Sequence, residues 1–74
     1  MSDASEVALA KLVQIYSSAG NGTKKQIAAI EALGRLGGGG AVKALIKIYD
    51  SAGNGTGRQI AAILAIGEAG RLMM

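Results

Sequence analysis

Two identical Gly-Asn-Gly-Thr segments are the part of this sequence best suited to binding a charged ligand. They occupy residues 20–23 and 53–56, and each leads into a predicted helix with basic residues beside it. Free N–H groups and the positive dipole end of a helix N-terminus can hold a phosphate. A phosphate or nucleic-acid contact would use Gly20, Asn21, Gly22, Thr23, Lys24, Lys25, Gly53, Asn54, Gly55, Thr56 and Arg58.

The same loops also have a purely structural interpretation. Residues 52–59 lack the first glycine, the lysine and the following hydroxyl residue of a phosphate-binding P-loop, and no predicted strand precedes them. A similarity to the helix-hairpin-helix motif is weakened by a missing proline, a longer loop and an Asn in place of the apolar middle residue. A glycine that ends one helix and a threonine that begins the next explain the same residues. We favour this structural interpretation and keep weak phosphate or nucleic-acid binding as the alternative function.

The residue types needed for catalysis are scarce. The chain has no His and no Cys, which removes the commonest general base, the commonest metal ligand and thiolate chemistry. The two tyrosines, Tyr16 and Tyr49, lie at equivalent positions of predicted apolar stripes, and we interpret them as packing residues. No convincing acid–base pair is found among the carboxylates, which are Asp3, Glu6, Glu31, Asp50 and Glu68. The sequence therefore predicts a protein that is not an enzyme and uses no cofactor or metal.

Charge and hydropathy indicate a solvated surface. The net charge is +3. The basic residues are spread over all the predicted helices with acids between them, and they are Lys11, Lys24, Lys25, Arg35, Lys43, Lys47, Arg58 and Arg71. No aromatic residues lie among them to stack on bases, so a nucleic-acid footprint is disfavoured. No apolar run approaches the roughly 18 residues of a membrane span, and the polar start MSDASE is unlike a signal peptide. We expect a soluble, cytoplasmic protein.

The whole chain is built on an internal repeat. Residues 15–30 and 48–63 are identical at 13 of 16 positions, at an offset of 33 residues. The register continues outward, since Leu9 matches Val42 and Gly34 matches Gly67. A period of this size is typical of architectures in which one supersecondary unit stacks on its copy. We expect one domain, 1–74, with repeat one at about 4–37 and repeat two at about 41–72.

Helical periodicity predicts two helices in each repeat. The expected ranges are about 4–18, 23–36, 41–51 and 56–72, with Asp3 and Glu6 as a capping box for the first. Gly20 is expected to end the first helix in a left-handed conformation. Thr23 with Gln26 and Thr56 with Gln59 have the spacing of helix N-terminal caps. The predicted buried stripes are Leu9, Leu12, Val13 and Tyr16; Ile27, Ile30, Leu33 and Leu36; Val42, Leu45, Ile46 and Tyr49; and Ile60, Ile63 and Ile66.

The glycines between the predicted helices and those inside them have separate explanations. Residues 37–40 are all glycine, and we predict a tight turn there rather than an interdomain linker, because neither half has a core alone. Gly34 and Gly67 occupy the same repeat position within helices, where glycine costs about 1 kcal/mol relative to alanine. We expect both of them to permit close contact between helices.

The segment from Ala28 to Tyr49, AAIEALGRLGGGGAVKALIKIY, resembles the HEAT-like repeats of phycobilisome-lyase-type proteins. Those repeats join Ala-Leu-Gly-x-(Ile/Leu)-Gly, a three-residue turn and Ala-Val-x-x-Leu-Ile. The resemblance covers the chain from about Leu9 onward, with an all-glycine turn where the family is often charged. It implies an all-α fold: four helices as two stacked helical hairpins of an α-solenoid, with no particular reaction. The glycine enrichment is compatible with an engineered or consensus-like origin.

The ends of the repeat array suggest self-association. A solenoid needs about three repeats and usually has polar terminal caps, whereas two repeats are present and the second becomes more apolar. Leu64 replaces Glu31, and the sequence continues to Leu72, Met73 and Met74. We predict a non-catalytic protein–protein interaction or assembly module. A homo-oligomer, as a dimer or head-to-tail stack, would use a face formed by Leu64, Leu72, Met73 and Met74.

Overall fold

The computed structural model of the protein describes residues 4–71, which form four α-helices and no strand. The helices are α1 (Ala4–Ser18), α2 (Lys24–Leu36), α3 (Gly38–Ser51) and α4 (Gly57–Arg71). The all-α fold predicted from the sequence is confirmed. Within residues 4–71, no helix combines the length and the apolar character that a membrane span requires.

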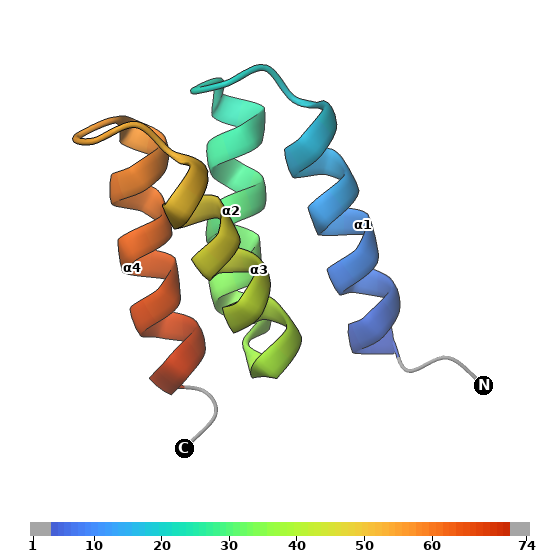
Figure 1. Ribbon diagram of the computed structural model, residues 1–74. Helices are drawn as coiled ribbons and strands as arrows, with labels where there is room; N and C mark the ends of the chain where they lie inside the picture. Colours follow the sequence, from blue (N-terminus) through green and yellow to red (C-terminus); the bar gives the residue numbers. More distant parts are fainter. Residues whose placement is uncertain (1–3, 72–74) are drawn as a thin grey trace.

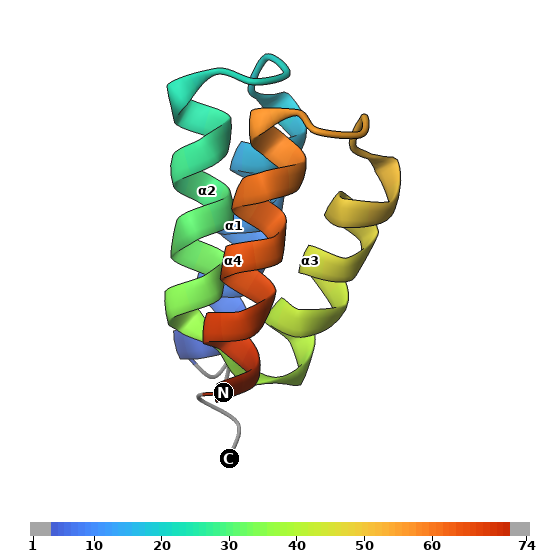
Figure 2. The same ribbon diagram turned by 90° about the vertical axis from the view of Figure 1, so that its left-hand side faces the viewer.

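The chain forms two helical hairpins in succession. α1 packs against α2 and α3 packs against α4, and the loops inside the two hairpins lie at the same end of the molecule (Figure 1). The turn from α2 to α3 lies at the opposite end. The most extensive contact between the hairpins joins α2 to α4, which lie side by side in Figure 2. α1 and α3, in contrast, touch each other little.

The core combines large side chains of two helices with small side chains of a third. Ile30 and Leu33 of α2 and Leu45 of α3 have no exposed surface. From α4 the buried side chains are all alanines, namely Ala62, Ala65 and Ala69. Alanines on this side of α4 allow its backbone to approach α2 closely, because they occupy little of the space between the helix axes.

Gly34 marks the closest part of this approach. A Cβ added to Gly34 would lie 2.9 Å from the Cα and Cβ of Ala65 and 3.1 Å from its carbonyl oxygen. These distances are shorter than van der Waals contact, so only glycine fits at this crossing. The prediction of a close helix contact is confirmed for Gly34. It is wrong for Gly67 within the chain, since a Cβ there would meet nothing within 4 Å.

The turn between the hairpins is shorter than predicted. α3 begins at Gly38 rather than at Ala41, and Gly37 is both the last cap of α2 and the first cap of α3. Gly37 and Gly38 have φ values of 69° and 86°, a left-handed region that glycine enters without a steric penalty. Gly39 and Gly40 are helical. The reversal is therefore made at two successive glycines, and the two others become the first turn of α3.

The expectation that Gly20 ends α1 in a left-handed conformation is wrong. Gly20 does not have a positive φ; the left-handed residues of the hairpin loops are Gly22 and Gly55, with φ of 78° and 76°. α1 ends at Ser18, where the Ala19 N–H donates to the Ile15 carbonyl at 3.0 Å. The predicted capping residue Asp3 lies outside the described residues.

The predicted apolar stripes are only partly buried. Val13 and Ile46 of the first helices of each repeat are exposed, and Tyr49 is exposed where Tyr16 is half-buried. Ile60 and Ile63 of α4 are also exposed, although both were expected in the core. The expectation was wrong for these residues because the side of α4 that carries Ile60 and Ile63 faces away from α2 and α3.

Candidate interaction surface

The Gly-Asn-Gly-Thr loops are held by their own side chains. Thr23 and Thr56 accept the N–H of Gln26 and Gln59, each at 3.3 Å, which confirms the predicted N-terminal caps. The carbonyls of Gly20 and Gly53 accept the two threonine hydroxyls at 2.7 Å. The local hydrogen bonds thus close each loop as a helix start.

The two glutamines complete the loops. Gln26 accepts the N–H of Gly22 at 2.8 Å and donates to the Asn21 side-chain oxygen at 3.2 Å. Gln59 repeats this pattern with Gly55 at 2.7 Å and Asn54 at 3.3 Å. The N–H groups of Gly22 and Gly55 that a phosphate would need therefore already have protein acceptors.

Arg58 connects the second loop to the first repeat. Its guanidinium donates to the Tyr16 hydroxyl at 3.1 Å, to the Asn21 side-chain oxygen at 3.2 Å and to the Ser51 carbonyl at 3.2 Å. The structure thus brings Arg58 and Asn21 together, two of the residues named for a phosphate site, through a bond that links the repeats. Lys24 and Lys25 are exposed at the start of α2. Phosphate or nucleic-acid binding at these loops stays a prediction.

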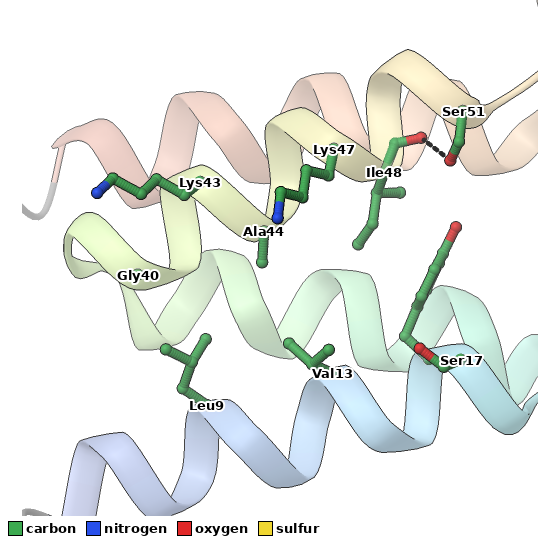
Figure 3. Close-up of a pocket in the computed structure, with 10 residues that line it drawn as sticks. Leu9, Val13, Ser17, Gly40, Lys43, Ala44, Lys47, Ile48 and Ser51 are labelled. Carbon is green, nitrogen blue, oxygen red and sulfur yellow. Dashed lines mark hydrogen bonds between the residues drawn. The ribbon is translucent and has the colours of Figure 1, made fainter.

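A hollow of about 540 Å³ lies between α1 and α3. Leu9 and Val13 of α1 face α3 across it, and Lys43 and Lys47 extend from α3 (Figure 3). The hollow exists because α1 and α3 touch little while α2 and α4 pack closely. It accounts for the exposure of Val13, which the predicted stripe had placed in the core.

The carboxylates Glu31 and Glu68 share a smaller hollow of about 210 Å³ between α2 and α4, together with Arg35. Leu64 lines the same hollow and is 70% exposed. The hollow holds no other ionisable side chain. Glu31 and Glu68 thus line the same hollow as the basic side chain of Arg35 on α2.

One side of the second repeat is more exposed than the equivalent side of the first repeat. Ile30 is fully buried, whereas its equivalent Ile63 is 51% exposed. Gly34 is buried and Gly67 is exposed. The members of this second-repeat face are Ile46, Tyr49, Ile60, Ile63, Leu64 and Gly67. In repeat one the equivalents of Ile63 and Gly67 lie under repeat two, so this face is the surface on which a third repeat would pack.

On another side of the molecule, residues of the first repeat are more exposed than their equivalents in the second repeat. Ala65 is only 5% exposed, whereas its equivalent Ala32 is partly exposed. The same holds for Ala41 and Ala8, and for Ile48 and Ile15. We define the first-repeat face as Val7, Ala8, Ile15, Ala32 and Leu36. In repeat two the equivalents of Ala8, Ile15, Ala32 and Leu36 are buried.

A cluster of metal-binding side chains is not found in the described part of the chain. No group of three or more His, Cys, Asp or Glu residues there could hold a metal ion. No buried side-chain nitrogen or oxygen of residues 4–71 lacks a hydrogen-bond partner. The buried polar side chains of this region therefore all have partners within the described residues.

Comparison of the chain with protein-family models, with curated proteins and with solved structures finds no match in any of the three.

The sequence identified one member of the second-repeat face and missed most of the others. Leu64 was named for self-association and is exposed as expected. Leu72, Met73 and Met74, named with it, lie outside the described residues. Ile60 and Ile63 were assigned to the core. The signal that could have found them was the repeat itself, because within residues 4–71 repeat two covers this surface of repeat one and no described element covers the equivalent surface of repeat two.

Proposed function

We propose that this protein is a non-catalytic protein–protein interaction module of the HEAT-like repeat type that associates with itself through its uncovered apolar faces. The observation that carries the proposal is the exposure of Ile63, at 51%, in the position where Ile30 has no exposed surface. Fully burying an isoleucine side chain stabilises a contact by about 1.5–3 kcal/mol. Ile63 occupies the repeat position that Ile30 occupies in the core, so a second copy packed over it could bury it in the same way.

The second-repeat face also has the composition of an interface. Its large side chains are aliphatic or aromatic, and Ile60, Ile63 and Leu64 follow one another around the uncovered side of α4. Contiguous exposed apolar patches on small proteins mark interaction sites. The absence of large aromatic anchors other than Tyr49 favours a contact that depends on shape and on closely packed helices.

The oligomeric state tests this proposal. Light scattering after size-exclusion chromatography is expected to give a mass above 7.4 kDa that rises with protein concentration. Ile63→Glu is expected to return the mass to that of a monomer, since it places a charge in the contact. Val13→Glu is the matched control, because Val13 is exposed in the hollow between α1 and α3 rather than on either face. A mass of 7.4 kDa for the unmodified protein at every concentration would overturn the proposal.

A further inference from the structure

We infer that the second-repeat face of one copy receives the first-repeat face of another copy, in the register in which the two repeats pack inside the chain. The inference rests on the proposed self-association and adds its partner surface, direction and register. Its basis is continuity with an interface already present: the contact between repeat one and repeat two is a template for the contact between copies. Each contact of the template can be moved forward by 33 residues and compared with the residues found there.

The closest helix contact transfers without change. Inside the chain, Gly34 lies against Ala65. Moved by one repeat, the pair becomes Gly67 of one copy and Ala32 of the next, again a glycine and an alanine. Gly67 has open space where its Cβ would be, and Ala32 is partly exposed. Both halves of the helix crossing are therefore present and uncovered.

The first helices show an exchange of volume. A Cβ added to Gly40 would clash with the Leu9 side chain, so inside the chain a large residue lies over a glycine. One repeat further on, Leu9 becomes Val42 and the next copy supplies Val7 in place of Gly40. The side chain at the first position loses one carbon, from Leu to Val, and the one at the second position gains three, from Gly to Val. The contact between copies is therefore bulkier than its template by two carbons, and it gives the exposed Val7 an apolar neighbour.

The polar contact between the repeats also has an equivalent. Arg58 donates to the Tyr16 hydroxyl and the Asn21 side-chain oxygen. In the contact between copies, Lys25 would take the place of Arg58 and would face Tyr49 and Asn54. Both lysine and arginine donate hydrogen bonds to neutral oxygens. The basic character of the donor and both acceptors are thus preserved.

Charge is complementary in the same register. Arg35 and Glu68 line one hollow between α2 and α4. Moved by one repeat, Glu68 of one copy would line the equivalent hollow with Arg35 of the next, so opposite charges meet again. Leu64 and Glu31 exchange sides in this hollow, so its charged and apolar residues stay the same. Leu36 takes the place of Ala69, which makes the contact between copies more apolar than the internal one at that position.

A contact of this kind is heterologous, since two different surfaces meet. It leaves one face free at each end of every assembly, so copies add one after another unless the rotation closes a ring. A two-fold symmetric dimer would instead use the same face twice. The two arrangements are separated by blocking one face at a time.

The test uses two singly blocked variants of the full chain and their mixture. Ile63→Glu blocks the second-repeat face, and Ala32→Glu blocks the first-repeat face. Each variant alone is expected to be monomeric by light scattering and by sedimentation. An equimolar mixture is expected to form a dimer of twice 7.4 kDa and nothing larger, because each variant supplies the face that the other lacks. Val7→Glu replaces Ala32→Glu if circular dichroism shows that Ala32→Glu does not fold, since Val7 is exposed.

A glycine substitution tests the register. Inside the chain a Cβ on Gly34 would lie 2.9 Å from the Cα and Cβ of Ala65, so the same contact between copies has no room for a Cβ on Gly67. Gly67→Ala is therefore expected to abolish association while the monomer stays folded. Gly57→Ala is the control, because a Cβ on Gly57 also meets nothing within 4 Å and Gly57 belongs to neither face, and it is expected to leave association unchanged.

The results separate the two proposals. If the unmodified protein is monomeric at every concentration, both proposals are overturned. If it associates while Ala32→Glu and Val7→Glu still associate alone, self-association stands and the head-to-tail contact is overturned. The head-to-tail contact is also overturned if both blocked variants are monomeric and their mixture forms no dimer, or if Gly67→Ala associates as readily as Gly57→Ala.

Discussion

Gly34 and Ala65 are in direct contact across the interface of α2 and α4, since a Cβ on Gly34 would lie 2.9 Å from both the Cα and the Cβ of Ala65. The Cα and Cβ of Ala65 cannot move without moving α4. The separation of the two repeats is therefore set at this point by the absence of a side chain. The repeat-equivalent Gly67 has open space instead.

The two glycines are expected to respond in opposite directions to alanine. Gly34→Ala should lower the free energy of unfolding by about 1–3 kcal/mol, because an added methyl group pushes α2 away from α4. Gly67→Ala should raise the free energy of unfolding by up to about 1 kcal/mol, because alanine favours a helix and meets no neighbour. Urea titrations followed by circular dichroism, at a concentration where the protein is monomeric, measure both. Equal effects of the two substitutions would contradict the assigned helix crossing.

Gln26 is expected to be more important for stability than Gln59. Both side chains accept a glycine N–H, but Gln26 is only 2% exposed, whereas Gln59 is half-buried. Gln26→Ala should lower the free energy of unfolding by about 1–3 kcal/mol, because it removes a buried side chain together with its hydrogen bonds to Gly22 and Asn21. Gln59→Ala should have a smaller effect, since water can replace it. The same urea titrations compare the two, and a larger effect at Gln59 would contradict the difference in burial.

The helices and their starts could be predicted because their causes are local. α1 has its predicted bounds, and Thr23 and Thr56 cap the helices that they were expected to begin. A threonine hydroxyl needs only the N–H three residues later, and an apolar stripe needs only the helical period. Such information is contained in a few neighbouring residues of the sequence.

The faces of the repeats could not be predicted from the period alone. Ile30 and Ile63 end identical Gln-Ile-Ala-Ala-Ile segments, yet only Ile30 is covered. What distinguishes them is the presence of a following repeat, a property of the array rather than of the residue. The role of Arg58 was missed for a similar reason, because its partner Tyr16 lies 42 residues away in the sequence.

Gly38 and Gly39 provide a test of how α3 begins. A Cβ on either residue would meet nothing within 4 Å, so a substitution there changes only the backbone preference. Both glycines belong to the first turn of α3, but Gly38 has a φ of 86° and Gly39 does not have a positive φ. Gly38→Ala should lower the free energy of unfolding by about 1–2 kcal/mol. Gly39→Ala should leave it unchanged or raise it by up to about 1 kcal/mol. Thermal unfolding of the two variants measures the difference, and a turn extending through Gly40 would instead give them similar effects.

Arg58 and Tyr16 are expected to be energetically coupled. The guanidinium donates to the Tyr16 hydroxyl at 3.1 Å in a partly buried position between the repeats. A double-mutant cycle with Arg58→Ala and Tyr16→Phe should give a coupling of about 0.5–1 kcal/mol, because each substitution removes one partner of the same bond. Arg58→Ala alone should lower the stability by more than this coupling, since it also removes the bonds to Asn21 and Ser51.

The matched cycle uses Tyr49, the repeat equivalent of Tyr16, whose hydroxyl has no hydrogen-bond partner within residues 4–71. Arg58→Ala with Tyr49→Phe should show no coupling in the monomer. In the proposed assembly Tyr49 faces Lys25 of the next copy, so Tyr49→Phe should weaken association by a factor of about 2–10, corresponding to one modest hydrogen bond. It should leave the stability of the monomer unchanged. Coupling of Arg58 to Tyr49 in the monomer, or its absence with Tyr16, would contradict the placement of Arg58 at the contact between the repeats.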